Sequence, residues 1–296
     1  MIWYCQISLL SLGIKYKHMR PIYYLLFILI LASCEVDVTI GPKNTTYNRT
    51  IVNAPIVNTD TLQSGLIAYY PFNGNANDET LNKNHGTSHG ATLTDDRNGK
   101  ANSAYHFIKS EKALIKLNNI MPINNLKKVT IVCWAKKDFK TDNGVIFGSW
   151  YSGPDGDMGG PSTAPIGLYC ALTFDSPSSY SDVSVSVMGG DQLTTYREPI
   201  SFPTEWNMYT VVFDGSNPVK TERLKIYINT IQKHLPDDSY DRVPQAIGNL
   251  SNIALIGARG SNTGEFINAY FNGSIDDVRV YDKALTTKEV EYIYKH

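Results

Sequence analysis

The chain has 296 residues, of which 42% are hydrophobic and 19% are charged, a composition typical of a folded protein and not of a disordered one. It carries 27 basic and 28 acidic residues, so its formal net charge of -1 excludes the strongly basic class of nucleic-acid-binding proteins. Four cysteines in this length exclude a disulfide-dense scaffold.

The first segment has the order of a secretory signal peptide. Lys15, Lys17 and Arg20 precede ten apolar residues at 22–31, and this run is only half of the roughly 20 residues that a membrane-spanning helix needs. A basic region, a short apolar run and then small residues are the features of a secretory signal. We therefore predict that residues 1–33 are a signal peptide.

The four residues that end this segment, Leu31-Ala32-Ser33-Cys34, resemble the lipobox of bacterial lipoproteins. The resemblance implies that cleavage leaves Cys34 as a lipid-modified N-terminus. Firm attachment would then need more than one acyl chain, because a single chain binds membranes only marginally. The expected location is the cell envelope, at the outer membrane or cell surface, with the periplasmic face as an alternative. An uncleaved anchor, or an ordinary signal with a chance cysteine, is the competing interpretation.

Residues 34–62 are predicted to be a tether, since they are rich in Asn, Thr and Val and show no clear hydrophobic period. An extra edge strand at Thr50-Ile51-Val52 is the alternative. Removal of residues 1–33 would leave 24 basic and 28 acidic residues. The mature chain is therefore expected to be mildly acidic.

Residues 63–296 have the pattern of one all-β domain. Asn-Gly or Asp-Gly dipeptides, which mark tight turns, occur six times. Short β-branched and aromatic runs lie between them, and strands are expected at Leu66–Tyr70, Ala113–Leu117, Val129–Ala135, Ile166–Phe174, Val183–Val187, Met208–Phe213, Leu224–Ile228, Ile253–Ile256 and Ser274–Tyr281. Many short strands separated by turn signals indicate a sandwich or jelly roll.

One helix is expected, at the end of the chain. Thr286-Thr287-Lys288-Glu289 is a capping-box pattern, with Thr286 as N-cap and Glu289 three residues later. Val290, Ile293 and Tyr294 then fall on one face of the helix. We expect that face to pack against the sandwich.

Two segments at the ends of the domain carry a family resemblance. Gly65–Glu79 and Phe271–Leu285 resemble the opening and closing motifs of laminin-G-like jelly-roll domains, and Glu205–Gly215 with Leu224–Asn229 resembles their central hairpin. The resemblance implies a concanavalin A-like sandwich of two antiparallel sheets with a short C-terminal helix. The chain departs from the family at Phe107-Ile108-Lys109, where Phe-Asp-Gly is common, and this departure weakens the expectation of a family-like metal or ligand rim.

Such folds also host glycoside hydrolases of the laminarinase type, which need carboxylates alternating along one strand as acid and nucleophile. The nearest pattern, Glu35-Val36-Asp37, lacks the last carboxylate and lies in the tether. The histidines show no metal-binding spacing, and no Gly-x-Ser-x-Gly motif is present. We therefore expect no catalytic residues and no enzyme activity.

Calcium is the expected cofactor, in a structural role, because it prefers carboxylate, amide and carbonyl oxygens on turns. Asn73 and Asp78 supply such oxygens in the opening loop. Strict alternation along the last strand would place Asp276 on the same face as Val278 and Val280, pointing inward. The proposed metal ligands are therefore Asn73, Asp78 and Asp276.

The alternative for Asp276 needs no metal. A buried carboxylate can be satisfied by backbone N–H groups or by an arginine. Arg97 and Arg259 are the two candidate partners that the sequence offers.

A second candidate site lies around the long loop that follows Trp150. Trp150 and Tyr151 flank a polar turn containing Asp155, and Tyr180 and Tyr196 are candidates for the same rim. Aromatic faces stack on sugar rings while polar neighbours bond the hydroxyls, so these residues form the predicted carbohydrate site. The alternative is that the aromatic residues pack the loop onto its own sheet and that Asp155 is solvated.

Cys133 and Cys170 lie in two predicted strands, and they are either a disulfide or two small buried thiols. Trp134 and Trp206 are expected in the core.

The sequence as a whole predicts a lipid-anchored, lectin-like envelope protein that binds a glycan or surface polysaccharide. A protein–protein adhesion or assembly module is the alternative, and a glycoside hydrolase is the third.

Overall fold

The computed structural model describes residues 62–117, 126–139, 144–151, 166–175, 180–187, 195–198, 204–234, 245–246, 254–260 and 267–296. Only the backbone is described for residues 149–151, for the three strands between 166 and 198, and for residues 259, 260 and 268. Residues 1–61, including Cys34, lie outside the described residues, so the signal peptide, the lipid attachment and the tether stay predictions.

The larger of the two main sheets has eight strands. They are β1 (Leu66–Tyr70), β3 (Thr92–Thr94), β4 (Ala104–Phe107), β6 (Lys128–Lys137), β11 (Asn207–Asp214), β12 (Leu224–Ile228), β13 (Ile231–Lys233) and β17 (Gly273–Tyr281). Their order is β13-β12-β11-β6-β17-β4-β3, and β1 also pairs with β17. The first and last strands of the domain are therefore neighbours in the large sheet.

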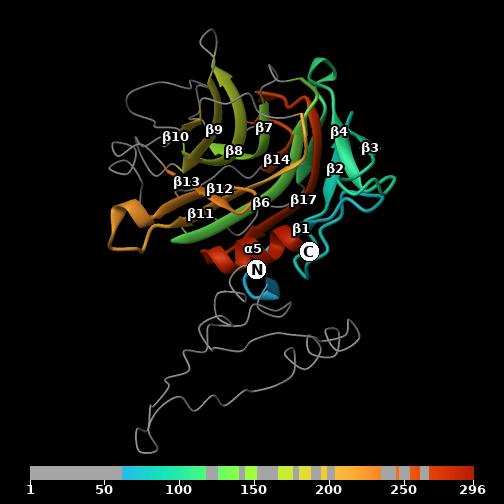
Figure 1. Cartoon of the computed structure of the whole chain (residues 1–296). Helices are drawn as coiled ribbons and strands as arrows, with labels where there is room; N and C mark the ends of the chain where they lie inside the picture. Colours follow the sequence, from blue (N-terminus) through green and yellow to red (C-terminus); the bar gives the residue numbers. More distant parts are fainter. Residues whose placement is uncertain are drawn as a thin grey trace, which may run out of the picture. The chain divides into compact units, whose positions relative to one another are not determined.

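The second sheet has seven strands and lies face to face with the large sheet (Figure 1). Its strands are β2 (Gly86–His89), β5 (Leu114–Leu117), β7 (Gly144–Tyr151), β8 (Ile166–Asp175), β9 (Tyr180–Val187), β10 (Thr195–Glu198) and β14 (Ala254–Ile256). Their order is β10-β9-β8-β7-β14-β5-β2. A small ribbon of β15 (Arg259–Gly260) and β16 (Ile267–Asn268) and two 3-10 helices, η1 (Lys109–Glu111) and η2 (Lys220–Glu222), complete the described elements.

The main hydrophobic core fills the space between the two sheets. Side chains at alternate strand positions, such as Ile131, Val211 and Phe213 of the large sheet, meet Ile115 and Phe147 of the second sheet. Alternation of this kind is what a sandwich requires, because successive side chains of a strand point to opposite faces. The predicted class, an antiparallel concanavalin A-like sandwich, is confirmed.

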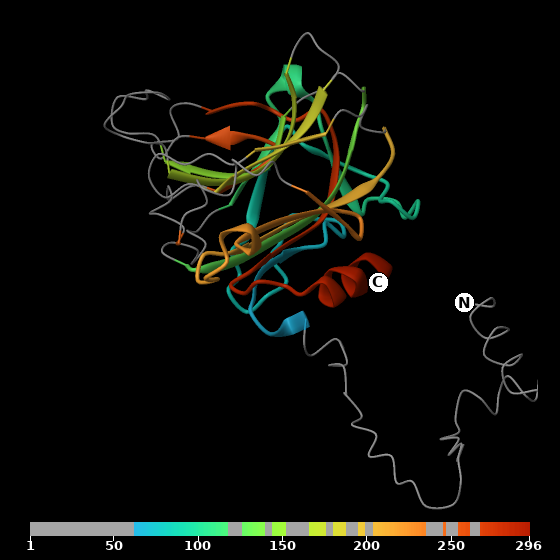
Figure 2. The same ribbon diagram turned by 60° about the vertical axis from the view of Figure 1, so that its left-hand side comes forward.

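Helix α5 (Thr287–Lys295) covers the opposite face of the large sheet, the face turned away from the second sheet (Figures 1 and 2). The predicted capping box at Thr286 and Glu289 is present. Val290 and Ile293 are buried in a second apolar cluster that includes Trp134 and Tyr281 of the sheet. None of the described helices is both long and apolar enough to cross a membrane.

Candidate functional site

Strand β17 contains a β-bulge that sets the geometry of the site. Ile275 and Val278 both belong to the core between the sheets, although residues three positions apart in a regular strand point to opposite faces. The register with β6 shifts between Asp276 and Arg279, and Asp277 has a positive φ of 49°, a conformation that Asp tolerates better than most residues. Asp277 is therefore the extra residue of the bulge.

The bulge corrects the prediction about Asp276. Strict alternation places Asp276 on the face of Val278 and Val280, but the extra residue reverses the side-chain parity, and Asp276 lies on the outer face. Its register partner there is Trp134 of β6. Asp276 is 2% exposed, and the alternative prediction, pairing with Arg97, is confirmed.

Two arginines, two aspartates and one tyrosine form a connected set of polar contacts on this outer face. Arg97 Nη1 donates to Asp276 Oδ2 at 2.8 Å and to Asp277 Oδ2 at 2.6 Å. The Tyr69 hydroxyl donates to Asp277 Oδ1 at 2.8 Å. Arg279 Nη2 donates to the Tyr69 hydroxyl oxygen at 3.2 Å and to Asp277 Oδ1 at 3.4 Å. We call these five residues the Asp277 network.

Burial shifts the acidity of two groups in the Asp277 network. Burial and the adjacent Asp277 carboxylate raise the pKa of Asp276 to about 7, although the Arg97 guanidinium acts in the opposite direction. Burial is also the largest cause that raises the pKa of Tyr69 to about 12. The Tyr69 hydroxyl therefore keeps its proton at neutral pH and acts as the donor to Asp277, whereas Asp276 changes charge near neutrality.

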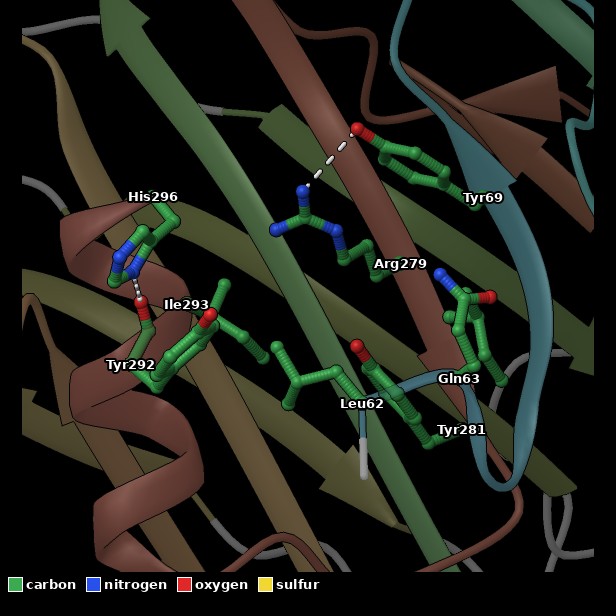
Figure 3. Close-up of a pocket in the computed structure, with 9 residues that line it drawn as sticks. Leu62, Gln63, Tyr69, Arg279, Tyr281, Tyr292, Ile293 and His296 are labelled. Carbon is green, nitrogen blue, oxygen red and sulfur yellow. Dashed lines mark hydrogen bonds between the residues drawn. The ribbon is translucent and has the colours of Figure 1, made fainter. Parts of the chain in front are cut away.

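A pocket of about 280 Å³ lies beside the Asp277 network. Leu62 and Tyr69 come from the segment that enters the domain, Arg279 and Tyr281 from β17, and Tyr292 from α5. Figure 3 shows Tyr69 and Tyr281 on two sides of the Arg279 side chain, whereas Tyr292 lies on the helix, with its ring stacked on that of His296 at 4.1 Å between centroids. The pocket thus joins the two ends of the domain, and it lies on the outer face of the large sheet.

The Arg279 guanidinium presents unused hydrogen-bond donors to this pocket. Nη2 contacts Tyr69 and Asp277, but Nε and Nη1 have no hydrogen-bond acceptor in the described part of the chain. The guanidinium carbon lies 4.6 Å from the centroid of the Tyr69 ring, and the side chain is 16% exposed. Because guanidinium carries five N–H donors, the three N–H groups on Nε and Nη1 are available to a bound molecule.

Asp78, predicted to bind calcium, instead holds the opening loop together. Its Oδ1 accepts hydrogen bonds from the backbone N–H groups of Tyr69 at 3.0 Å and Thr80 at 2.9 Å. Its Oδ2 accepts from the Thr80 hydroxyl and from the Asn84 N–H, both at 2.9 Å. These four donors satisfy the carboxylate without a cation.

The other two predicted ligands are also engaged separately. Asn73 Oδ1 accepts a hydrogen bond from Lys100 Nζ at 2.6 Å, and Asp276 is paired with Arg97. Within the described ranges, no cluster of three or more His, Cys, Asp or Glu side chains is suited to a metal. Asn73, Asp78 and Asp276 therefore do not fit a shared calcium ion, and calcium binding stays a prediction that these side chains do not support.

The predicted carbohydrate rim falls on the part of the second sheet for which only the backbone is described. Trp150 and Tyr151 end β7 and pair with the first two residues of β8, whereas Tyr180 pairs with the last residue of β8. At about 3.3 Å per residue, roughly 25–30 Å separates these ends, so the register does not bring Tyr180 together with Trp150. Tyr196 lies in β10 opposite Val183, and Asp155 lies outside the described residues.

The structure locates both predicted core tryptophans, but it does not test the predicted cysteine pair. Trp134 is buried against α5, and Trp206 packs at the margin of the same cluster. The Cys133 thiol is buried in the core, with its sulfur 3.8 Å from the Tyr209 carbonyl oxygen. The side chain of Cys170 lies outside the described residues, so the disulfide stays a prediction.

The sequence predictions did not include the pocket residues Tyr69, Arg279, Tyr281 and Tyr292. Tyr69 and Arg279 are 210 positions apart in the chain, and no local pattern brings them together. One signal was present, because Asp276 and Asp277 are two successive carboxylates in a strand with apolar neighbours. Two adjacent acids in a buried strand require cationic partners, and arginines are the natural candidates.

Comparison with known families gives one match that covers most of the domain. A family model described as the concanavalin A-like lectin/glucanases superfamily matches residues 109–291. No curated protein matches the chain. The matched range runs from η1 into α5, so it includes Arg279 and the strands of both sheets from β5 onward, but not β1 to β4.

Solved structures of similar fold include two that hold a saccharide. Domain 4 of AbnA, a GH43 extracellular arabinanase from Geobacillus stearothermophilus solved in complex with arabinotriose, is 16% identical with a TM-score of 0.50, over 78% of this chain and 98% of that one. The receptor binding domain of botulinum neurotoxin D is 13% identical with a TM-score of 0.52, over 79% and 53%. The serotype D ligand binding domain in complex with N-acetylneuraminic acid is 12% identical with a TM-score of 0.50, over 79% and 51%.

This chain thus spans about half the length of the toxin domains. At these identities the likeness shows a shared fold.

Proposed function

The chain belongs to the concanavalin A-like lectin/glucanase superfamily, and we propose that it is a non-catalytic, lectin-like protein that binds carbohydrate. The observation that carries this proposal is the pocket between β1, β17 and α5, which is lined by Tyr69, Tyr281 and Tyr292 together with Arg279. Aromatic rings stack on the apolar faces of sugars, and nearby polar groups bond the hydroxyls. The pocket offers both kinds of contact.

The size of the pocket indicates how much sugar it accepts. Its volume of about 280 Å³ is close to the lower end of the range for small-molecule sites, which is roughly 300–1,000 Å³. One sugar ring fits such a space, and a long stretch of polymer does not. We therefore propose recognition of a single residue or a chain end, with the remaining sugars in solvent.

The arrangement of carboxylates favours binding over hydrolysis. Glycoside hydrolysis needs two carboxyl groups on either side of the scissile bond, about 5–9 Å apart. Asp276 and Asp277 are adjacent in the chain and both contact the same nitrogen of Arg97, so they do not flank a common substrate. Neither residue lines the pocket described above. The saccharides bound to two of the structures with a similar fold lend further support to a binding role.

The cellular part of the proposal rests on the sequence. Residues 1–33 would direct export and Cys34 would carry the lipid, which would hold the domain at the envelope surface through the tether. Labelling with a radioactive fatty acid tests this directly: we expect incorporation into the wild-type chain and none into the Cys34→Ala variant. Incorporation into neither, or membrane retention of the variant, would contradict the anchor.

A glycan array probed with the full chain tests the binding proposal. We expect binding that Tyr292→Ala weakens about 5- to 30-fold, since loss of one stacking ring removes on the order of 1–2 kcal/mol. Tyr294→Ala is the matched control, because Tyr294 lies on the same helix but stacks on Trp134, outside the pocket. No binding by the wild type, or equal loss in both variants, would contradict a sugar site at this pocket.

A further inference from the structure

The two arginines of the Asp277 network differ in how fully they are used. Arg97 Nη1 contacts both Asp276 and Asp277 at 2.8 and 2.6 Å, and its guanidinium also stacks on the Trp134 ring at 4.6 Å. Arg279 also lies 4.6 Å from a ring, that of Tyr69, but its one carboxylate contact among the described residues is the longer one of 3.4 Å with Asp277, through an oxygen shared with Tyr69. The positive charge of Arg279 is therefore balanced less completely than that of Arg97.

The incomplete charge balance of Arg279 matters because its side chain is largely buried. A charged group removed from water needs a counter-charge and hydrogen-bond partners, and donors left without acceptors are costly. The Arg279 side chain is only 16% exposed, and its Nε and Nη1, which meet no acceptor among the described residues, are not sealed from solvent, so a molecule in the pocket can reach them. A ligand that enters the pocket with a negatively charged oxygen would supply both the charge and the acceptor.

Resting on the proposed function, we propose that this pocket selects saccharides that carry a carboxylate, and that Arg279 is the residue that binds the carboxylate. A neutral sugar would offer only hydroxyl oxygens to Arg279. A carboxylate makes charge-assisted hydrogen bonds with guanidinium, which are shorter and about twice as strong as neutral ones. Uronic acids combine such a group with a pyranose ring and, unlike N-acetylneuraminic acid, differ from a common neutral sugar only in the carboxylate, so they are the proposed ligand class.

The tyrosine rings explain why the ligand is a saccharide and not a simple organic acid. Tyr281 and Tyr292 line the pocket together with the apolar side chains of Leu62 and Ile293. Figure 3 shows the Arg279 guanidinium between Tyr69 and the helix that carries Tyr292. A carboxylate bound to Arg279 would leave its attached ring against these walls, where stacking adds to the affinity.

The test uses the full chain and a panel of matched oligosaccharide pairs that differ only in the carboxylate: glucuronate with glucose, galacturonate with galactose, and mannuronate with mannose. Binding is measured by calorimetry at low and high salt. For at least one pair we expect the acidic member to bind about tenfold or more tightly. We expect this advantage to shrink at 0.5 M salt, because exposed parts of the ion pair are screened.

Three variants test whether Arg279 causes the preference for the acidic member. Arg279→Gln is expected to weaken binding of both members, because both lose hydrogen bonds from Arg279, and to weaken the acidic member more, so that its advantage is lost. Arg279→Lys keeps the charge but loses the planar set of donors, so we expect an intermediate preference. Arg223→Gln is the control, because Arg223 bonds the Asn217 carbonyl oxygen outside the pocket, and thermal melting checks that each variant is folded.

The outcomes separate this inference from the function on which it rests. Equal affinity for the acidic and neutral members in the wild type overturns the inference and leaves carbohydrate binding intact. An acidic preference that persists in Arg279→Gln also overturns it, since another residue must then bind the carboxylate. Absence of binding to every saccharide of the panel overturns both proposals. If Arg279→Gln does not fold, a reduced preference in Arg279→Lys supports the inference, and full retention there overturns it.

Discussion

The two faces of the large sheet are built from the same strands and differ in almost every other respect. The inner face is apolar, and Ile275, Val278 and Val280 of β17 pack there against the second sheet. The outer face of the same strand presents Asp276 and Arg279, and α5 lies beside them (Figure 2). One strand therefore supplies both the core and the polar network.

The bulge at Asp277 is what allows this division. In a regular strand, successive side chains alternate between the two faces, so Asp276 would share a face with Val278. The extra residue keeps the aliphatic side chains inside on both sides of the irregularity and gathers the charged ones outside. The apolar core and the proposed recognition site thus lie on opposite faces of the same strand.

The largest expected effect is on the inner face. Phe213 is fully buried at the centre of the core, and Phe213→Ala is expected to lower the free energy of unfolding by about 3–5 kcal/mol. Urea denaturation measures the loss. Leu81→Ala is the control, since Leu81 is 98% exposed and the change should stay within about 0.5 kcal/mol. Similar losses in both variants would show that the core assignment is wrong.

A smaller effect is expected on the outer face, where stability should depend on pH through Asp276. The folded-state pKa of this group is raised to about 7, above the usual value of about 3.9. Between these values the folded state keeps a proton that the unfolded state has lost, so stability falls as pH rises through this window. We expect the contribution to be on the order of 2 kcal/mol between pH 5 and pH 8.

Comparison with two variants isolates that contribution. Unfolding in urea at pH 5 and pH 8 should show a difference in the wild type that Asp276→Asn removes. Asp214→Asn should retain it, because hydrogen bonds from Ser216 and Lys128 hold the pKa of Asp214 below its usual value despite partial burial. Asp214 therefore titrates outside this window. The same pH dependence in the wild type and in Asp276→Asn would exclude Asp276 as its source.

Local patterns predicted most of the fold. The strands at Leu66–Tyr70 and Leu224–Ile228 have the predicted bounds, since β-branched and aromatic runs between turn signals indicate strands directly. Short strands such as β3 (Thr92–Thr94) and β13 (Ile231–Lys233) were not predicted, because three residues carry no measurable alternation. The class of fold followed from the motifs at the two ends of the domain.

The site was less predictable, for physical reasons. Arg279 was not selected, because its role depends on Tyr69 from the other end of the domain and on the bulge at Asp277. A bulge needs one residue with positive φ, and the sequence Asp276-Asp277 permits this without requiring it. The Asp78 carboxylate is a typical metal-ligand group. Only the positions of the Tyr69 and Thr80 N–H groups show that it accepts backbone hydrogen bonds instead.

A moderate effect is expected at the helix that walls the pocket. The Thr286 Oγ1 accepts from the Glu289 N–H at 3.3 Å, and Glu289 Oε2 accepts from the Thr286 N–H at 2.7 Å. Thr286→Ala should lower the free energy of unfolding by about 1 kcal/mol, and Thr286→Ser should retain it because Ser also caps helices. Because α5 carries Tyr292, we expect the Ala variant also to bind sugar more weakly. Equal stability of the two variants would contradict the capping role.

The smallest effect is expected from removal of divalent cations. EDTA should change the melting temperature by less than about 1 °C, because a ligand that binds the folded state stabilises it only if a site exists. The Arg97 guanidinium at 2.8 Å already supplies the positive charge that Asp276 needs, and four donors satisfy Asp78.

Calcium addition provides the sharper version of this test. A cation bound by Asp276 would have to displace Arg97, which would leave a guanidinium stacked on Trp134 without its carboxylate partners. If EDTA lowers the melting temperature by several degrees and calcium restores it, Asp276→Asn decides where the ion binds. A calcium effect lost in that variant would place a cation in the Asp277 network, whereas an effect retained there would place it elsewhere in the chain and leave the arginine-based account of the outer face intact.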